Sequence, residues 1–253
     1  MTEMTLFRTI VLLAALVGFG AGVVLTVVQQ FGTQPLIVKA EVFEQARSEA
    51  SAPKPHDHEP SGAHDHLAAS AADVAAAEAH EHGGGDEWAP ADGAERFLWT
   101  LAANVVSGVG FALLLVAASE LKGGLTSWRE GLFWGLAGFA VFTLAPSIGL
   151  PPEAPGVEGA PLMDRQVWWI GTAVATAAGL ALLAYGRSAL AALGAIVLIA
   201  APHVIGAPQA TEAPAIPRDL EHDFVVAVTV TGFVFWAAIG VLAGALRGRF
   251  AAA

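Results

Sequence analysis

The chain has 253 residues, of which 55 % are hydrophobic and only 14 % charged, and its formal net charge is −11. Soluble globular domains carry about 25 % charged residues, so this composition indicates a membrane protein, and the negative charge argues against nucleic acid as a partner. The sequence contains no cysteine. Disulfides, thiolate zinc sites and iron–sulfur clusters are thereby excluded, which leaves imidazole, carboxylate and carbonyl oxygen as possible metal ligands.

Six apolar stretches are long enough to cross a lipid bilayer, which takes about 20 residues. They cover residues 8–29, 97–120, 131–150, 166–185, 188–206 and 223–246. The sequence therefore predicts an all-α, polytopic membrane helix bundle with about six transmembrane helices and a disordered His-rich outer loop. The expected organisation is a first transmembrane helix (1–30), an amphipathic or interfacial helix (31–50), a disordered extracytoplasmic loop (51–95) and a five-helix membrane bundle (96–253).

The first stretch could also be a signal peptide, since it follows a single Arg8. Its apolar run is longer than the roughly 7–15 residues of the apolar core of a signal peptide, and no clear A-x-A cleavage site follows, so we predict a retained helix. Downstream, PLIVKAEVFEQARSEA (35–50) places Leu36, Ile37, Ala40 and Phe43 on one helical face. This segment is either an interfacial helix or an extension of the first span.

Six of the eight histidines lie between residues 55 and 82 in three His–acid–His triplets. The triplets are His56-Asp57-His58, His64-Asp65-His66 and His80-Glu81-His82. Imidazole binds Co²⁺, Ni²⁺, Cu²⁺ and Zn²⁺, and a neighbouring carboxylate adds a ligand or attracts the cation. The triplets predict weak transition-metal binding without selectivity for one metal; a merely polar spacer is the alternative. We expect no tightly bound cofactor, but a transported or loosely bound divalent metal, Co²⁺ first, with Ni²⁺ and Zn²⁺ as further candidates.

The predicted spans contain almost no ionisable side chains, and His203 is the exception. Ionisable groups inside a membrane are functional candidates, and Pro202 frees the carbonyl of Leu198, which could join the imidazole in coordinating a cation. The alternative is an interfacial histidine that is hydrogen-bonded to a neighbouring loop.

A weak internal repeat relates LAPSIGLPPEAP (144–155) to AAPHVIGAPQATEAP (200–214). If the two segments are duplicated, Pro146 and Pro202 flank a common outward vestibule; otherwise both are ordinary helix terminators. Its rim would hold Glu153, Glu212, His222 and Asp223. Three polar residues of the spans, Gln29, Gln30 and Asn104, either line a pathway or form interhelical hydrogen bonds.

The basic residues of the short loops predict the orientation in the membrane. With six spans, both termini share one side, which carries six basic and three acidic residues, whereas the other side holds the remaining twenty acids. The positive-inside rule then places both termini in the cytoplasm and the histidine triplets outside. No nucleotide-binding, metalloprotease or nucleophile-elbow motif occurs, so no enzyme is expected.

The sequence resembles the CbtA-type family of proposed bacterial cobalt transporter subunits. The matching stretches include FRTIVLLAALVGFGAGVVLTVVQQ (7–30), PLIVKAEVFE (35–44), TLAANVVSGVGFALLL (100–115), GLFWGLAGFAVFTLAPSIGLPPEAPG (131–156), RQVWWIGTAVATAAGLALLA (165–184) and APHVIGAPQ (201–209). The resemblance implies a multi-pass protein of the bacterial inner membrane, linked to cobalamin biosynthesis, with a small single-span His-rich CbtB-type partner. The matched positions Glu41, Glu44, Pro146, Pro202 and His203 become candidate pathway residues.

Two hypotheses follow. The first is a membrane subunit for uptake of a divalent transition metal, most simply cobalt, in which the outer loop captures the ion and passes it to a vestibule near His203. The second is a non-transporting membrane chaperone or sensor that delivers metal to a partner complex.

Overall fold

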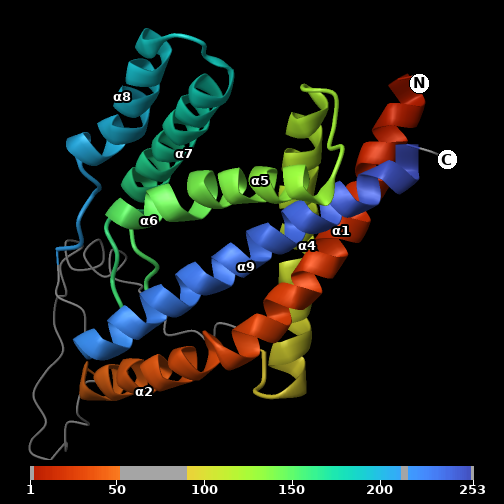
Figure 1. The fold of residues 1–253 in the computed structure, drawn as a ribbon. Helices are drawn as coiled ribbons and strands as arrows, with labels where there is room; N and C mark the ends of the chain where they lie inside the picture. Colours follow the sequence, from red (N-terminus) through yellow and green to blue (C-terminus); the bar gives the residue numbers. More distant parts are fainter. Residues whose placement is uncertain (1–2, 52–89, 212–215, 252–253) are drawn as a thin grey trace, which may run out of the picture.

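The computed structural model describes residues 3–51, 90–211 and 216–251, and these form helices and connecting loops without a β-strand (Figure 1). In chain order the helices are α1 (Glu3–Phe31), α2 (Gln34–Ser51), α4 (Ala94–Glu120), α5 (Trp128–Phe139), the π-helical segment η1 (Ala140–Leu144), α6 (Ala145–Gly149), α7 (Leu162–Tyr185), α8 (Ala189–Ile205) and α9 (Arg218–Ala251). The predicted all-α fold is confirmed.

Five segments are long and apolar enough to cross a membrane. They are Leu6–Phe31, Ala94–Glu120, Trp128–Gly149, Leu162–Tyr185 and Arg218–Arg249. The fifth predicted span, 188–206, corresponds to α8 (Ala189–Ile205), an apolar helix of 17 residues. At about 1.5 Å per residue, α8 is a few residues short of a typical bilayer core. The prediction of about six membrane helices therefore agrees with five long helices and one shorter one.

Helices α1 and α4 cross at glycines, in an antiparallel arrangement. A Cβ atom on Gly18 would lie 2.6 Å from the carbonyl carbon of Gly108, and one on Gly22 would lie 2.7 Å from Val105 Cα. Such distances are shorter than any real Cβ contact, so only glycine fits at these positions. Close approach of two backbones through small residues four apart is the usual packing mode of membrane helices.

Helices α5 and α9 also cross closely at glycines, which lie on both helices. A Cβ atom on Gly131 would lie 2.9 Å from Gly244 Cα, and one on Gly240 would lie 2.9 Å from Gly135 Cα. Helix α9 also packs along α1, so that α1, α4 and α9 share one core, in which Leu13, Val17, Val116 and Ile239 are buried.

The third predicted span is interrupted by the π-helical segment η1. The Ala145 N–H bonds to the Ala140 carbonyl, five residues back, and Pro146 has no N–H to continue the α-helical pattern. Side chains stabilise the segment: Trp236 Nε1 of α9 donates to Thr143 Oγ1 (3.2 Å), and Ser147 Oγ donates to the Thr143 carbonyl (2.6 Å). The chain crosses the bundle here through three consecutive helical segments.

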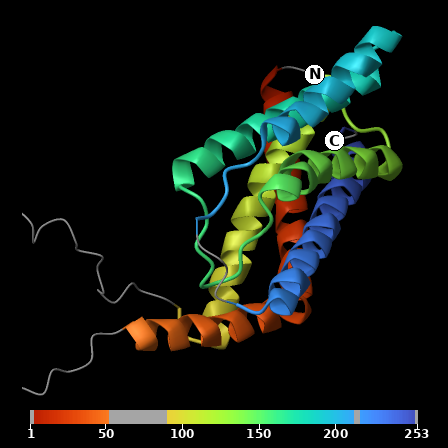
Figure 2. The same ribbon diagram turned by 90° about the vertical axis from the view of Figure 1, so that its left-hand side faces the viewer.

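Helices α7 and α8 form a hairpin that stands beside the rest of the bundle (Figures 1 and 2). Within the hairpin, Gly179 lies against α8, since a Cβ there would be 3.0 Å from the Ala195 carbonyl oxygen. The hairpin joins the bundle where α7 packs on η1 and α6.

Helix α2 lies across one end of the bundle (Figure 2). Its Ala40 is buried with Ala154, Ile216 and Phe224, and its Leu36 and Ile37 pack against the same cluster. Phe43, expected on the same face, is 39 % exposed. Helix α2 thus packs on α9 and on the loop after α6, and Phe43 is not part of that cluster.

Candidate functional site

The charged side chains of the described residues gather at two opposite ends of the bundle. At the first end lie both chain termini (Figure 1), the Glu120–Arg247 pair (2.7 Å) and the Lys122–Glu130 pair (3.9 Å). We call it the basic end. At the other end, which we call the α2 end, Glu41 pairs with Arg96 and Glu153 pairs with Arg165. This arrangement agrees with the prediction that successive spans cross the membrane in opposite directions. Which end faces the cytoplasm stays a prediction.

A polar cavity of about 320 Å³ opens at the α2 end between α1, α2 and α4. Its polar lining residues are Gln30, Gln34, Glu41, Asp92, Arg96 and Thr100. Arg96 bridges Glu41 and Asp92, with its Nη1 3.1 Å from Asp92 Oδ1. The predicted pathway residue Glu41 therefore lies in a cavity, with its charge balanced by a guanidinium group.

A short hydrogen-bonded network lies between α1 and α4, next to this cavity. Asn104 Nδ2 donates to Gln29 Oε1 (2.6 Å) and to Thr26 Oγ1 (2.9 Å), and Thr26 Oγ1 donates to the Gly22 carbonyl (2.9 Å). Asn104 is one turn along α4 from Thr100, which lines the cavity. Gln29 and Asn104 thus make the interhelical bonds that were one of the two sequence interpretations, while Gln30 faces the cavity.

Trp168 of α7 joins the ends of α6 and α8. Its Nε1 donates to the Pro202 carbonyl (3.2 Å), and its ring lies edge-on to the His203 imidazole with centroids 5.9 Å apart. A Cβ on Gly149 would lie 2.7 Å from Trp168 Cζ2 and 2.9 Å from Ala207 Cβ. The two proline-containing segments therefore meet at one tryptophan, which has no distinctive signal in the sequence.

The hydrogen bonds around His203 determine which neighbouring groups could bind a cation together with its imidazole. The Pro202 carbonyl accepts two hydrogen bonds, from Trp168 Nε1 and from the Gly206 N–H (3.0 Å). Because a carbonyl oxygen has two lone pairs, this one has no further capacity for a metal ion. Pro146 and Pro202 are both buried, and His203 is half-buried. The groups that remain here for coordination are the imidazole and the Leu198 carbonyl, to which Pro202 has no N–H to donate.

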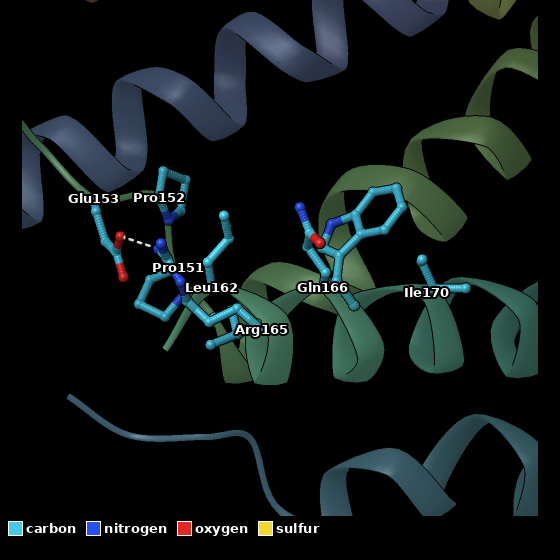
Figure 3. Close-up of a pocket in the computed structure, with 9 residues that line it drawn as sticks. Pro151, Pro152, Glu153, Leu162, Arg165, Gln166 and Ile170 are labelled. Atoms are coloured by element: carbon cyan, nitrogen blue, oxygen red, sulfur yellow. Dashed lines mark hydrogen bonds and ion pairs between the residues drawn. The ribbon is translucent and has the colours of Figure 1, made fainter. Parts of the chain in front are cut away.

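A larger cavity, of about 650 Å³, lies between the loop after α6 and the start of α7 (Figure 3). It is lined by Leu150, Pro151, Pro152, Glu153, Leu162, Arg165, Gln166, Trp169 and Ile170. Figure 3 shows the Glu153–Arg165 pair at one edge, with Gln166 and Ile170 further along α7. Glu153, expected at the rim of a vestibule, is therefore at the edge of a cavity and is paired with Arg165.

The remaining candidates are dispersed. His222 and Asp223 are exposed in the first turns of α9, and Glu44 lies against the loop at Gly156. The three histidine triplets and Glu212 lie outside the described residues. Among residues 3–51, 90–211 and 216–251, no three His, Asp or Glu side chains come close enough together to hold a metal ion.

Long apolar helices that cross at glycines, with charged groups at both ends, define a multi-pass α-helical membrane protein. The chain belongs to the CbtA family, described as probable cobalt transporter subunit, whose model matches residues 7–248. No curated protein and no solved structure matches it. The resemblance seen in the sequence is confirmed. A transporter subunit is not a class of enzyme; the family implies a metal cargo, cobalt, and a partner subunit.

Proposed function

We propose that this chain is the membrane subunit of a Co²⁺ uptake system of the bacterial inner membrane, with its basic end in the cytoplasm. The match to the CbtA family over residues 7–248 carries this proposal. The distribution of charge supports the direction: under this orientation the acidic residues concentrate on the outer side, where they raise the local concentration of divalent cations.

In this proposal the triplets at 55–82 capture the metal and deliver it to the outer ends of the helices. The segment that carries them connects α2 to α4, so its second end joins the fold at Asp92 and Arg96, beside the polar cavity. Gln30 and Glu41 are the first groups of the bundle that a released ion would meet there. His203, at the outer end of α8, is the proposed ligand of the vestibule.

Replacing His203 with alanine should lower uptake of radiolabelled cobalt by whole cells about tenfold at limiting cobalt, because a metal-binding imidazole is lost. The matched control is Trp168→Phe, which keeps an aromatic ring beside His203 but removes the hydrogen bond to Pro202. Uptake near the wild-type level in Trp168→Phe, together with a loss in His203→Ala, supports a ligand role. Unchanged uptake in His203→Ala would remove this residue from the mechanism.

Exchanging the six histidines of 55–82 for glutamine should reduce uptake at low cobalt and leave it unchanged at saturating cobalt. A capture device raises the local concentration of the ion, and this advantage disappears once the transport step is saturated. The exchange preserves the length of the segment and its carboxylates, so an effect reports on the imidazoles. An equal loss at every cobalt concentration would contradict the capture role.

The chaperone or sensor remains the second candidate because no three metal-binding side chains converge among the described residues. In that case a partner subunit would supply the missing ligands, and the small single-span CbtB-type protein implied by the resemblance is the proposed partner. Purified protein in liposomes separates the two functions: flux of Co²⁺ supports transport, whereas binding without flux, alone and with the partner, supports delivery. Parallel measurements with Ni²⁺ and Zn²⁺ test the choice of metal.

A further inference from the structure

An apolar groove of about 440 Å³ runs between α4, α5 and α7 in the half of the bundle nearest the basic end. Its walls combine five alanines with larger apolar side chains: Ala118, Ala137, Ala177, Ala181 and Ala184 together with Leu114, Leu115, Phe133, Trp134 and Leu180. Its floor is formed by Val141, Phe142 and Trp236, where the Phe142 and Trp236 rings stack with centroids 5.5 Å apart. The α7–α8 hairpin packs on η1 and α6 near the start of α7. The later part of α7 is left apart from α4 and α5, and the groove lies in the space between them.

The mouth of the groove differs from its interior. Lys122 is the charged residue of the lining, and its Nζ lies 5.9 Å above the ring of Tyr185, so the two residues face each other across the mouth from α4 and α7. Lys122 is 53 % exposed, and its contact with Glu130 is long, at 3.9 Å. Arg129 and Arg187 follow on the adjoining helix ends, whereas the other acid of this region, Glu120, is paired with Arg247. The mouth therefore carries an excess of positive charge.

The volume limits what can fill the groove. About 440 Å³ falls within the range of pockets for single small ligands, roughly 300–1,000 Å³, and is far too small for a transmembrane helix of a partner. Within a bilayer, an apolar groove that opens sideways between helices contacts acyl chains. A basic residue and a tyrosine at the mouth add a site for an anionic head group, as in other basic pockets between membrane helices.

We infer that this groove is a binding site for one anionic phospholipid of the leaflet at the basic end, with an acyl chain along the apolar walls and the head group at Lys122. Such a lipid fills the space between the hairpin and the α4–α5 pair, and it stabilises their relative position. The inference is independent of the metal-binding role proposed above.

The test measures the lipid that stays bound after the full-length protein is extracted from vesicles of equal parts phosphatidylglycerol and phosphatidylcholine. Native mass spectrometry should show the wild type retaining phosphatidylglycerol in preference to phosphatidylcholine. Lys122→Gln should lower that preference about fivefold, since one basic residue near anionic lipid is lost, and it should leave retention of phosphatidylcholine unchanged. Ala181→Trp, which fills the groove, should abolish retention of both lipids.

Two matched variants control for general damage. Ala178→Trp adds the same ring to an exposed position of α7 outside the groove lining, and Arg249→Gln removes an exposed charge at the same end. Both should retain phosphatidylglycerol like the wild type. Equal retention of the two lipids by the wild type, or wild-type retention in Ala181→Trp, would overturn the inference. So would a copurifying polypeptide that Ala181→Trp removes while phosphatidylglycerol stays bound, because the groove would then hold a protein segment.

Discussion

Replacing Gly240 with leucine should destabilise the bundle by about 3 kcal/mol or more, which is the upper part of the range for overpacked interiors. Even a Cβ at this position would lie 2.9 Å from Gly135 Cα and 3.0 Å from the Gly131 carbonyl carbon. These are backbone atoms of α5, which cannot move aside like a flexible side chain. Helices α5 and α9 would have to separate, and the packing along their whole contact would be lost. Thermal unfolding in detergent, followed with size-exclusion chromatography, measures the effect.

Gly110→Leu is the matched control for this substitution. Gly110 also lies within a membrane helix, but a Cβ there would meet no heavy atom within 4 Å, so leucine has room. The apparent melting temperature of Gly110→Leu should stay close to that of the wild type. Similar melting temperatures for the two variants would show that close packing at the α5–α9 crossing does not hold the bundle together.

The helices were predictable from the sequence because a bilayer imposes a length and an apolar composition on each of them. The pairing of Gly18 with Gly108 and of Gly135 with Gly240 was not predictable, since nothing local to a helix specifies its neighbour. The π-helical segment was not predicted either. It depends on Trp236, which reaches Thr143 from a helix some 90 residues further along the chain.

Candidate site residues were predictable where the signal is local. His203 stands out as an ionisable residue in an apolar stretch, and Glu41 was found through the family resemblance. Arg96 and Trp168 were missed as site residues, because an arginine at the start of a span and a tryptophan near an interface are common. Only tertiary structure brings Arg96 to Glu41 and Trp168 to the Pro202 carbonyl. Beside the candidate histidine, two hydrogen bonds occupy the Pro202 carbonyl oxygen, and one of them comes from Trp168 on another helix, which the sequence does not indicate.

Removing the guanidinium group of Arg247 should have the second large effect. Its Nε and Nη2 donate to the two carboxylate oxygens of Glu120, at 2.7 and 3.0 Å, and the side chains are only 12 % and 14 % exposed. Arg247→Met leaves the Glu120 carboxylate with little solvent and no counter-ion. Breaking a buried pair by removing one partner costs about 3–5 kcal/mol, and the partial exposure here places the expected loss near the lower limit. The free energy of unfolding in detergent, from denaturant titration, measures it.

The double variant Glu120→Met/Arg247→Met separates the cost of an unpaired charge from the contribution of the pair. Two apolar side chains of similar size leave no buried charge, so most of the stability lost in Arg247→Met should return. Arg249→Gln is the control for charge alone at the same end: Arg249 is exposed, and exposed charges contribute about 0–1 kcal/mol. If the double variant were as unstable as Arg247→Met, the pair itself would hold the ends of α4 and α9 together. If it regained stability but lost cobalt uptake, the pair would serve transport rather than folding.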